Sequence, residues 1–176
     1  LRAVKNRFGS INEIGVFEMT GTGLCEVKSP SKALLDAAGT GKPGSAVVTV
    51  MEGTRPLLLE IQALTSRRSF GIAQRTVTGY DYNRVLLAIA IIEKNLGIHM
   101  ENQDVFVNVA GGIKITETGA DLGCAVAVYS GFMDRPAPES TVFIGELGLD
   151  GSIRPVTSVD QRVAEAERMG FKACVV

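Results

Sequence analysis

TETGADLGCAVAVYSGF, residues 116–132, carries the clearest structural signal in the chain. Polar residues and Gly119 lead into a run of small and apolar side chains, which is typical of the first turns of a tightly packed, buried helix. We expect Thr118 to cap this helix, because Asp121 follows it at the three-residue spacing of a capping box. Asp121 would then lie in the first turn, where the helix dipole favours a negative charge.

Strand patterns lie on both sides of this segment. Residues 46–51 and 56–64 are rich in branched apolar side chains and predict two strands paired around a short turn. Alternating valines predict a strand over residues 104–109, and shorter strands are expected near residues 142–145 and 173–176. The chain therefore supplies strands both before and after the buried helix.

Two further helices are predicted from their caps. Asp81 or Asn83 can begin a helix that runs to Leu96, and Ser158 with Gln161 forms a second capping-box pattern at the start of the last helix. Helices and strands alternate in the second half, so the predicted fold class is α/β (α+β), with a layered mixed sheet packed by helices.

Composition limits the class of protein. The 176 residues are 45% hydrophobic, which is enough for one domain with a core and a short appendage. The longest apolar run, residues 85–92, is too short to cross a bilayer, so no membrane role is expected. Three cysteines without a CxxC pair predict neither a disulfide framework nor a zinc site, which fits a cytoplasmic location. Because the chain starts at Leu1 and stops inside an apolar run, we expect it to be part of a longer protein.

The net charge of -1 hides an uneven distribution. Residues 65–84 carry four arginines against Asp81 alone, whereas residues 134–167 carry seven acids against three arginines. Arginine suits phosphate because its planar donor fork binds two oxygens at once. The candidate DNA-binding residues are Arg67, Arg68, Arg75, Arg84 and Lys114.

Aromatic residues are interleaved with these cations. Phe70, Tyr80 and Tyr82 would be able to stack on exposed bases, which together with phosphate contacts is the usual way of binding nucleic acid without sequence specificity. The alternative is an ordinary solvated basic face, which the near-zero net charge of the whole chain favours.

A family resemblance rests on two segments. Residues 118–123, TGADLG, resemble the start of the catalytic helix in the Lon protease family, where an Asp-Gly-Pro-Ser-Ala-Gly motif holds the nucleophilic serine. Residues 145–166, GELGLDGSIRPVTSVDQRVAEA, resemble the Lon segment that ends in the partner lysine. Asp121 stands at the serine position and Asp160 at the lysine position. The resemblance implies a Lon-protease-like domain in which both members of the catalytic pair are acids.

Two acids cannot perform the Lon reaction. A serine–lysine peptidase needs a hydroxyl beside a lysine whose pKa is lowered by burial, so that the neutral amine accepts the serine proton. We therefore expect no protease activity and assign no catalytic residue. Asp121 and Asp160 would instead serve as first-turn acids at helix N-termini. The alternative is that the two carboxylates face one pocket and share a proton or a divalent metal, although we assign no metal site.

A second resemblance begins at KNRFG, residues 5–9. Lys5 and Arg7 alternate in a strand-like stretch, so both point to one side and can flank a phosphate. The whole chain resembles the C-terminal part of a family of bacterial DNA repair ATPases that join a RecA-like core to a Lon-like domain. In RecA-like rings of the replicative helicase type, a similar Lys-x-Arg element reaches a neighbouring subunit's ATP. The resemblance implies this role for Lys5 and Arg7; the alternative is a solvated basic hairpin.

This second resemblance also sets domain boundaries. Residues 1–28 would be the trailing β-ribbon of the RecA-like core, and residues 29–176 the Lon-like domain. No phosphate-binding loop motif is present, so ATP and magnesium would belong to the parent ATPase core and this chain itself would need no cofactor.

The favoured function follows from these resemblances. The chain would be the non-catalytic domain of a repair ATPase that acts in homologous recombination and branch migration. It would contribute contacts to single-stranded or branched DNA and assembly of a ring, hexameric in the parent, with the RecA recombinase as a further partner. The alternatives are an oligomerisation scaffold alone and, least favoured, a residual Ser-Lys peptidase.

Overall fold

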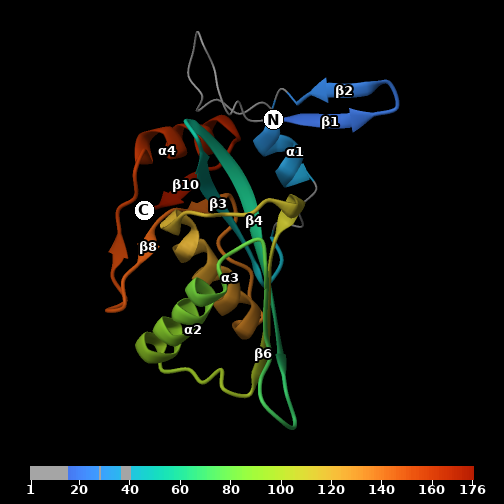
Figure 1. Cartoon of the computed structure of the whole chain (residues 1–176). Coiled ribbons are helices and arrows are strands. Elements are labelled where there is room, and N and C mark those ends of the chain that lie inside the picture. The colour runs from blue at the N-terminus through green and yellow to red at the C-terminus, as the bar shows by residue number, and fades with distance from the viewer. Residues whose placement is uncertain (1–15, 28, 37–40) are drawn as a thin grey trace.

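The computed structural model describes residues 16–27, 29–36 and 41–176 (Figure 1). The phosphate-contact prediction for Lys5 and Arg7 falls outside the described residues. At the N-terminal side of the described part, strands β1 (Phe17–Thr20) and β2 (Gly23–Glu26) pair antiparallel and form a ribbon separate from the main sheet.

The main sheet has six strands within the described residues, in the order β10-β7-β3-β4-β6-β5. Strand β3 pairs antiparallel with β4, and β4 pairs antiparallel with β6. The remaining neighbours, β10 with β7, β7 with β3, and β5 with β6, are parallel. This arrangement confirms the predicted mixed sheet. The strand bounds are β3 Ser45–Glu52, β4 Arg55–Arg67, β5 Arg75–Thr78, β6 Gln103–Val109, β7 Thr141–Phe143 and β10 Ala173–Val175.

Helices cover both faces of one half of this sheet. Their bounds are α1 Pro30–Asp36, α2 Tyr82–Leu96, α3 Asp121–Met133 and α4 Val159–Arg168. Val48 and Val50 of β3 point into a core shared with α2 and α3, whereas Val47 points into a second cluster with Leu35 of α1 and Ala166 of α4. Because successive strand residues alternate between faces, the continuous apolar run of β3 buries both sides of the sheet.

Helix α3 packs especially close to the sheet, as its small residues predict. A Cβ atom added at Gly123 would lie 2.0 Å from Val48 Cγ1, so only glycine permits this approach. At the far end of the helix, the buried Ser130 hydroxyl accepts a hydrogen bond from Gly44 N (2.9 Å) and donates one to the Arg135 carbonyl (2.5 Å). Ser130 therefore has a structural role in joining α3 to the loop before β3.

Helix α2 has the caps that the sequence predicts. The Asp81 carboxylate accepts a hydrogen bond from Arg84 N (2.9 Å), and Gly97 closes the helix in the left-handed conformation with φ at 64°. Asp81 is therefore the cap, and Asn83 lies inside the first turn.

The other two predicted caps are wrong. Thr118 belongs to a short 3-10 turn, η2 (Thr118–Ala120), and its hydroxyl donates to Glu146 Oε2 (2.5 Å), while α3 has no side-chain cap bond. Ser158 precedes α4 with φ at 58° and makes no side-chain cap bond. A capping box requires an extended backbone at the cap, which neither position has.

The connections around these helices include two further short elements. A 3-10 turn, η1 (Ala110–Gly112), follows β6, and a small hairpin, β8 (Glu146–Leu147) with β9 (Ile153–Arg154), follows β7. Strand β4 also continues to Arg67, three residues beyond its predicted end, because it keeps pairing with β6 down to Gln103.

Arg162 anchors α4 to the rest of the domain. Its side chain is fully buried and forms a bidentate pair with Glu117, at 2.7 Å to Oε1 and 2.6 Å to Oε2. It also donates to the carbonyls of Thr49 (2.6 Å) and Thr157 (2.9 Å). All these contacts satisfy a buried charge that would otherwise be strongly unfavourable.

We predict that Arg162→Met lowers the free energy of unfolding by about 3–5 kcal/mol, because methionine keeps much of the volume but leaves Glu117 without its cation. Urea denaturation measures the change. Arg168→Met on the same helix is the matched control: Arg168 is 53% exposed and pairs with Glu165, so its loss is expected to be below about 1 kcal/mol. Equal effects of the two substitutions would contradict the anchoring role of Arg162.

Candidate functional site

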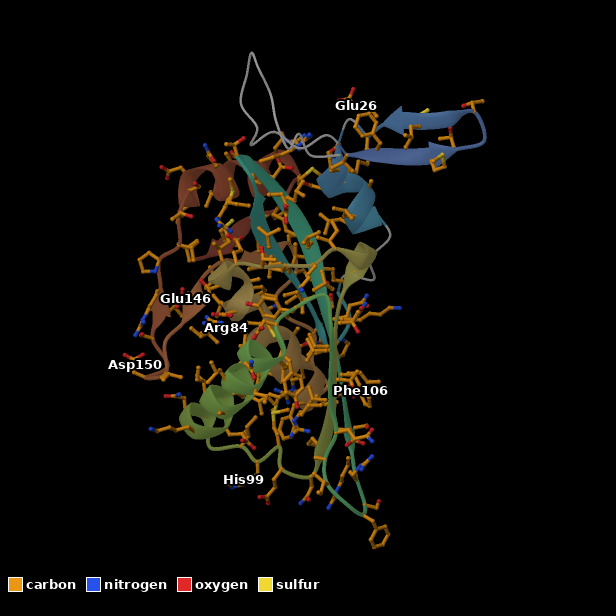
Figure 2. All side chains as sticks on the ribbon, in the orientation of Figure 1. Glu26, Arg84, His99, Phe106, Glu146 and Asp150 are labelled. Carbon is orange, nitrogen blue, oxygen red and sulfur yellow. The ribbon has the colours of Figure 1, made fainter. Side chains whose placement is uncertain are left out.

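Asp121 lies where three elements meet. It is the first residue of α3, close to the N-terminal turn of α2 and to the β8 hairpin that follows β7. Figure 2 shows Arg84 of α2 and Glu146 of β8 pointing toward one another in this region. The Gly145 carbonyl accepts a hydrogen bond from Leu122 N (3.1 Å), which fixes β8 beside the first turn of α3.

The Asp121 carboxylate is saturated with donors. Its Oδ1 accepts from the Tyr80 hydroxyl (2.5 Å) and from Arg84 Nε (3.0 Å). Its Oδ2 accepts from Arg84 Nη2 and from Leu147 N (3.1 Å). The acid is only 3% exposed, so this is a buried bidentate ion pair with two additional hydrogen bonds. Glu146 Oε1 lies 3.8 Å from Arg84 Nη2 on the outer side.

This cluster changes the acidity of its neighbours. Burial, and then the hydrogen bond to Asp121, raise the pKa of Tyr80 well above its usual value, so the phenol remains a neutral donor. The hydrogen bond to Asp121 raises the pKa of Arg84. Burial next to the same carboxylate raises the pKa of Cys124 to about 12. Cys124 is therefore an un-ionised thiol near neutral pH and a poor nucleophile.

The surroundings offer no serine–lysine chemistry. Every lysine in the described ranges is exposed, whereas the Lon mechanism requires a buried amine. Asp160 is exposed in the first turn of α4, and Asp121 is buried in the first turn of α3, so both occupy the predicted helix positions. Among the described residues, no group of three or more His, Cys, Asp or Glu side chains is arranged to hold a metal ion.

The structure divides the predicted basic residues into two groups. Arg67 ends β4 opposite Gln103 of β6, and Arg75 begins β5 opposite Val105 of the same strand, so the two arginines flank one end of β6. Arg68 lies beside them. Arg84 is instead turned toward Asp121, with 26% of its side chain exposed.

Two of the arginines at this end of the sheet are held by hydrogen bonds to neighbouring groups. Arg68 Nε donates to Asp104 Oδ2 (3.0 Å), and Arg75 Nη2 donates to the Met100 carbonyl (2.9 Å). Arg75 Nη1 also donates to the Gln103 carbonyl. Arg67 is exposed, and its guanidinium makes no hydrogen bond or ion pair within the described part of the chain.

Lys114 lies farther along the same edge of the sheet. Ile115 N donates to the Gly79 carbonyl (2.8 Å), which places the Lys114 segment at the end of β5 opposite to Arg75. Four residue steps of strand separate Arg75 from Gly79, roughly 13 Å. Lys114 is exposed.

The three aromatic side chains were predicted to be available for stacking, and two of them are exposed. Phe70 is 91% exposed and Tyr82 is 47% exposed, so both can reach a ligand. The prediction for Tyr80 is wrong, because this side chain is 7% exposed and donates to Asp121. Sequence offered no signal for that bond, since the two residues are 41 positions apart and follow no local spacing rule.

Comparison with known proteins defines the class of protein. Residues 64–176 match the family described as subunit ChlI of Mg-chelatase. This match covers more than half of the chain, which therefore belongs to that family.

Curated relatives give a more specific relation. The chain is 53% identical to the DNA repair protein RadA of Listeria monocytogenes over 172 residues, which are 98% of the chain. It is 49% identical to the DNA repair protein RadA of Bacillus subtilis over all 176 residues. The chain spans 38% of the length of each of these relatives. The expected resemblance to bacterial DNA repair proteins is thus confirmed: the chain is homologous to part of RadA.

We predict that Asp121→Asn lowers the free energy of unfolding by about 3–5 kcal/mol, because it removes the anion of a buried pair and leaves Arg84 without its counter-charge. The matched control is Asp160→Asn, which also removes a first-turn acid but from an exposed position. Its expected effect is below about 1 kcal/mol, the magnitude of a helix-dipole contact. Urea denaturation of both variants measures the change in the free energy of unfolding. Similar small losses would show that Asp121 stabilises the protein only through its contact with the helix dipole.

A second prediction concerns the cysteines. With the thiol reagent DTNB at pH 8, Cys25 should react rapidly because it is exposed, whereas Cys124 should react only after unfolding because it is buried and un-ionised. The Cys124→Ala variant assigns the slow phase. Rapid reaction of Cys124 in the folded protein would show that the α3 core is open to solvent.

Proposed function

We propose that this chain is a DNA-contacting domain without peptidase activity, related to the Lon proteases through residues 118–123 and 145–166. The observation that carries the proposal is the gathering of Arg67, Arg68 and Arg75 at one end of the sheet, next to the exposed Phe70. The relatives named DNA repair proteins support it.

The charge at this end favours a polyanion. Residues 61–80 contain no acid, and Arg68 forms an ion pair with the nearby Asp104. Arg67 and Arg75 therefore remain as cations without a carboxylate of the described residues hydrogen-bonded to them, although Glu93 and Glu101 line the same hollow as Arg75. Such cations attract phosphate without regard to base sequence. A phosphate backbone that follows β5 from this end would reach Lys114 after roughly 13 Å, about four nucleotide steps along a duplex.

The five predicted cations then have different tasks. Arg67 and Lys114 are exposed and bind phosphate directly. Arg75 adds charge, and Arg68, whose charge is balanced by Asp104, holds the loop that follows Arg67. Arg84 has a structural task, because a guanidinium paired with the buried Asp121 is not available to phosphate while that pair is intact.

Absence of peptidase activity follows from the degenerate Lon positions. Asp121 is surrounded by donors and has no hydroxyl nucleophile beside a buried amine. Casein and peptide substrates should show no turnover with the purified chain, and measurable turnover would contradict this part of the proposal.

The role in the whole protein is a further part of the proposal. Residues 1–28 would end a RecA-like ATPase core that binds ATP and magnesium, and residues 29–176 would form the Lon-like domain. Lys5 and Arg7 would contact the ATP of a neighbouring subunit in a hexameric ring. The assembly would act in the cytoplasm, in homologous recombination and branch migration, with RecA as a partner. Among the described helices, none combines the length and apolar character that crossing a bilayer requires.

A second candidate function is self-assembly alone. Among the described residues, no helix covers the face of β4 and β6 that points away from α2 and α3 near Leu64, which is 64% exposed. Phe106 lies on this open face in Figure 2. Sedimentation velocity without DNA tests this alternative. Concentration-dependent assembly of a chain that does not bind DNA would favour the scaffold.

We predict that Arg67→Ala weakens binding to all DNA sequences equally and lowers the slope of log affinity against log salt by about 1, because one phosphate contact is lost. Arg67→Ala combined with Lys114→Ala should lower the slope by about 2. Fluorescence anisotropy over a salt series measures both. Lys32→Ala, an exposed lysine on α1, is the control and should leave the slope unchanged. An unaltered slope in the double variant would refute this DNA surface.

A further inference from the structure

The loop between β4 and β5, residues 68–74, carries two apolar side chains in full contact with solvent. Phe70 and Ile72 are each 91% exposed. In Figure 1 this loop is the green turn at the lower end of the sheet, beyond the ends of α2 and α3. Two large apolar side chains this exposed within three residues of one loop are available for contact with a ligand.

The loop is braced from within. Arg68 Nη1 donates to the Ile72 carbonyl (2.8 Å), and Arg68 Nε donates to Asp104 Oδ2 (3.0 Å). The other oxygen of Asp104 accepts from Gln74 N (2.6 Å), and Arg68 N donates to the Asn102 carbonyl (2.8 Å). Both ends of the loop are thus tied to the start of β6. A backbone held in this way presents its side chains at low entropic cost when a ligand arrives.

The charge and the apolar side chains around the loop indicate the kind of ligand that fits it. Arg67, Arg68 and Arg75 flank the two apolar side chains, and no acid lies between residues 61 and 80. The matching ligand has a flat apolar face beside negative charge, which describes a nucleic-acid base with its phosphate. A planar ring at the tip, Phe70, suits stacking on a base, and Ile72 extends the same apolar surface.

We propose that the loop of residues 68–74 is a wedge that stacks Phe70 on an unpaired base, so that this domain prefers single-stranded or branched DNA to intact duplex. This inference rests on the proposed DNA-contacting function. In a duplex, insertion of Phe70 requires unstacking of paired bases, which opposes binding. At a fork or in a single strand the base is already free, and the stacking energy is gained without that opposition.

The experiment compares four proteins on two DNAs with equal numbers of phosphates, a forked DNA and a blunt duplex. The proteins are the full chain, Phe70→Ser and Ile72→Ser, with Leu149→Ser as the matched control because Leu149 is 70% exposed in the β8–β9 turn. Anisotropy at one fixed salt concentration gives the affinities. A 2-aminopurine base at the fork reports stacking directly through quenching of its fluorescence.

The wild-type chain should bind the fork more tightly than the duplex and should quench 2-aminopurine. Phe70→Ser should lose roughly five-fold or more in affinity for the fork, with no quenching and no change on the duplex. Ile72→Ser should show a smaller loss of the same kind, and Leu149→Ser should behave as wild type. Because both loop side chains are exposed, none of these substitutions should alter the urea midpoint.

Other results would overturn the wedge in distinguishable ways. Binding of both DNAs by the wild type, with Phe70→Ser unchanged on each, would remove the wedge but leave the DNA surface. Failure of the wild type to bind either DNA would remove the proposed function as well. A smaller sedimentation coefficient for Phe70→Ser, with DNA affinity intact, would assign the loop to contact between copies. Loss of binding to phosphatidylserine vesicles, again with DNA affinity intact, would assign it to a membrane surface.

Discussion

The rest of the structure depends on the ion pair between Asp121 and Arg84. A carboxylate buried at the start of α3 is tolerated only with a counter-charge and further donors, and Arg84, Tyr80 and Leu147 N supply them. Tyr80 and Arg84 come from around the start of α2, and Leu147 comes from β8. The pair therefore fixes the N-terminal turns of α2 and α3 and the β8 hairpin relative to one another, and the apolar core between α2, α3 and the sheet forms within that frame.

The Asp121–Arg84 pair bears on both parts of the proposed function, which are the absence of peptidase activity and the location of the DNA-contacting surface. The Asp121 carboxylate is a structural joint, because its two oxygens already accept four hydrogen bonds. Contacts with a ligand are therefore expected at another part of the surface. The lower end of the sheet has the complementary properties: Arg67 is exposed and Phe70 is in solvent, while Arg68 and Asp104 use their own pair to hold the loop.

Agreement between sequence and structure is best where the signal is local. The helix from Tyr82 to Leu96 has the Asp81 cap and the Gly97 ending that its sequence predicts, because both depend on the conformation of adjacent residues. Thr118 and Ser158 show where the same rule fails. Each has the right spacing, but the turn before the helix places the residue in a different backbone conformation, and the Thr118 hydroxyl donates a hydrogen bond to Glu146.

The sequence by itself determined the alternation of strands and helices, the close packing of α3 through Gly123, the acids at positions 121 and 160, and the clustering of arginines near residue 67. Each of these depends on residue type or on short spacing. Only the tertiary structure decided that Arg84 pairs with Asp121, that Tyr80 is buried, and that Arg68 braces a loop through Asp104. These contacts join residues more than thirty positions apart, and their partners are chosen by burial and charge once the sheet has brought the segments together.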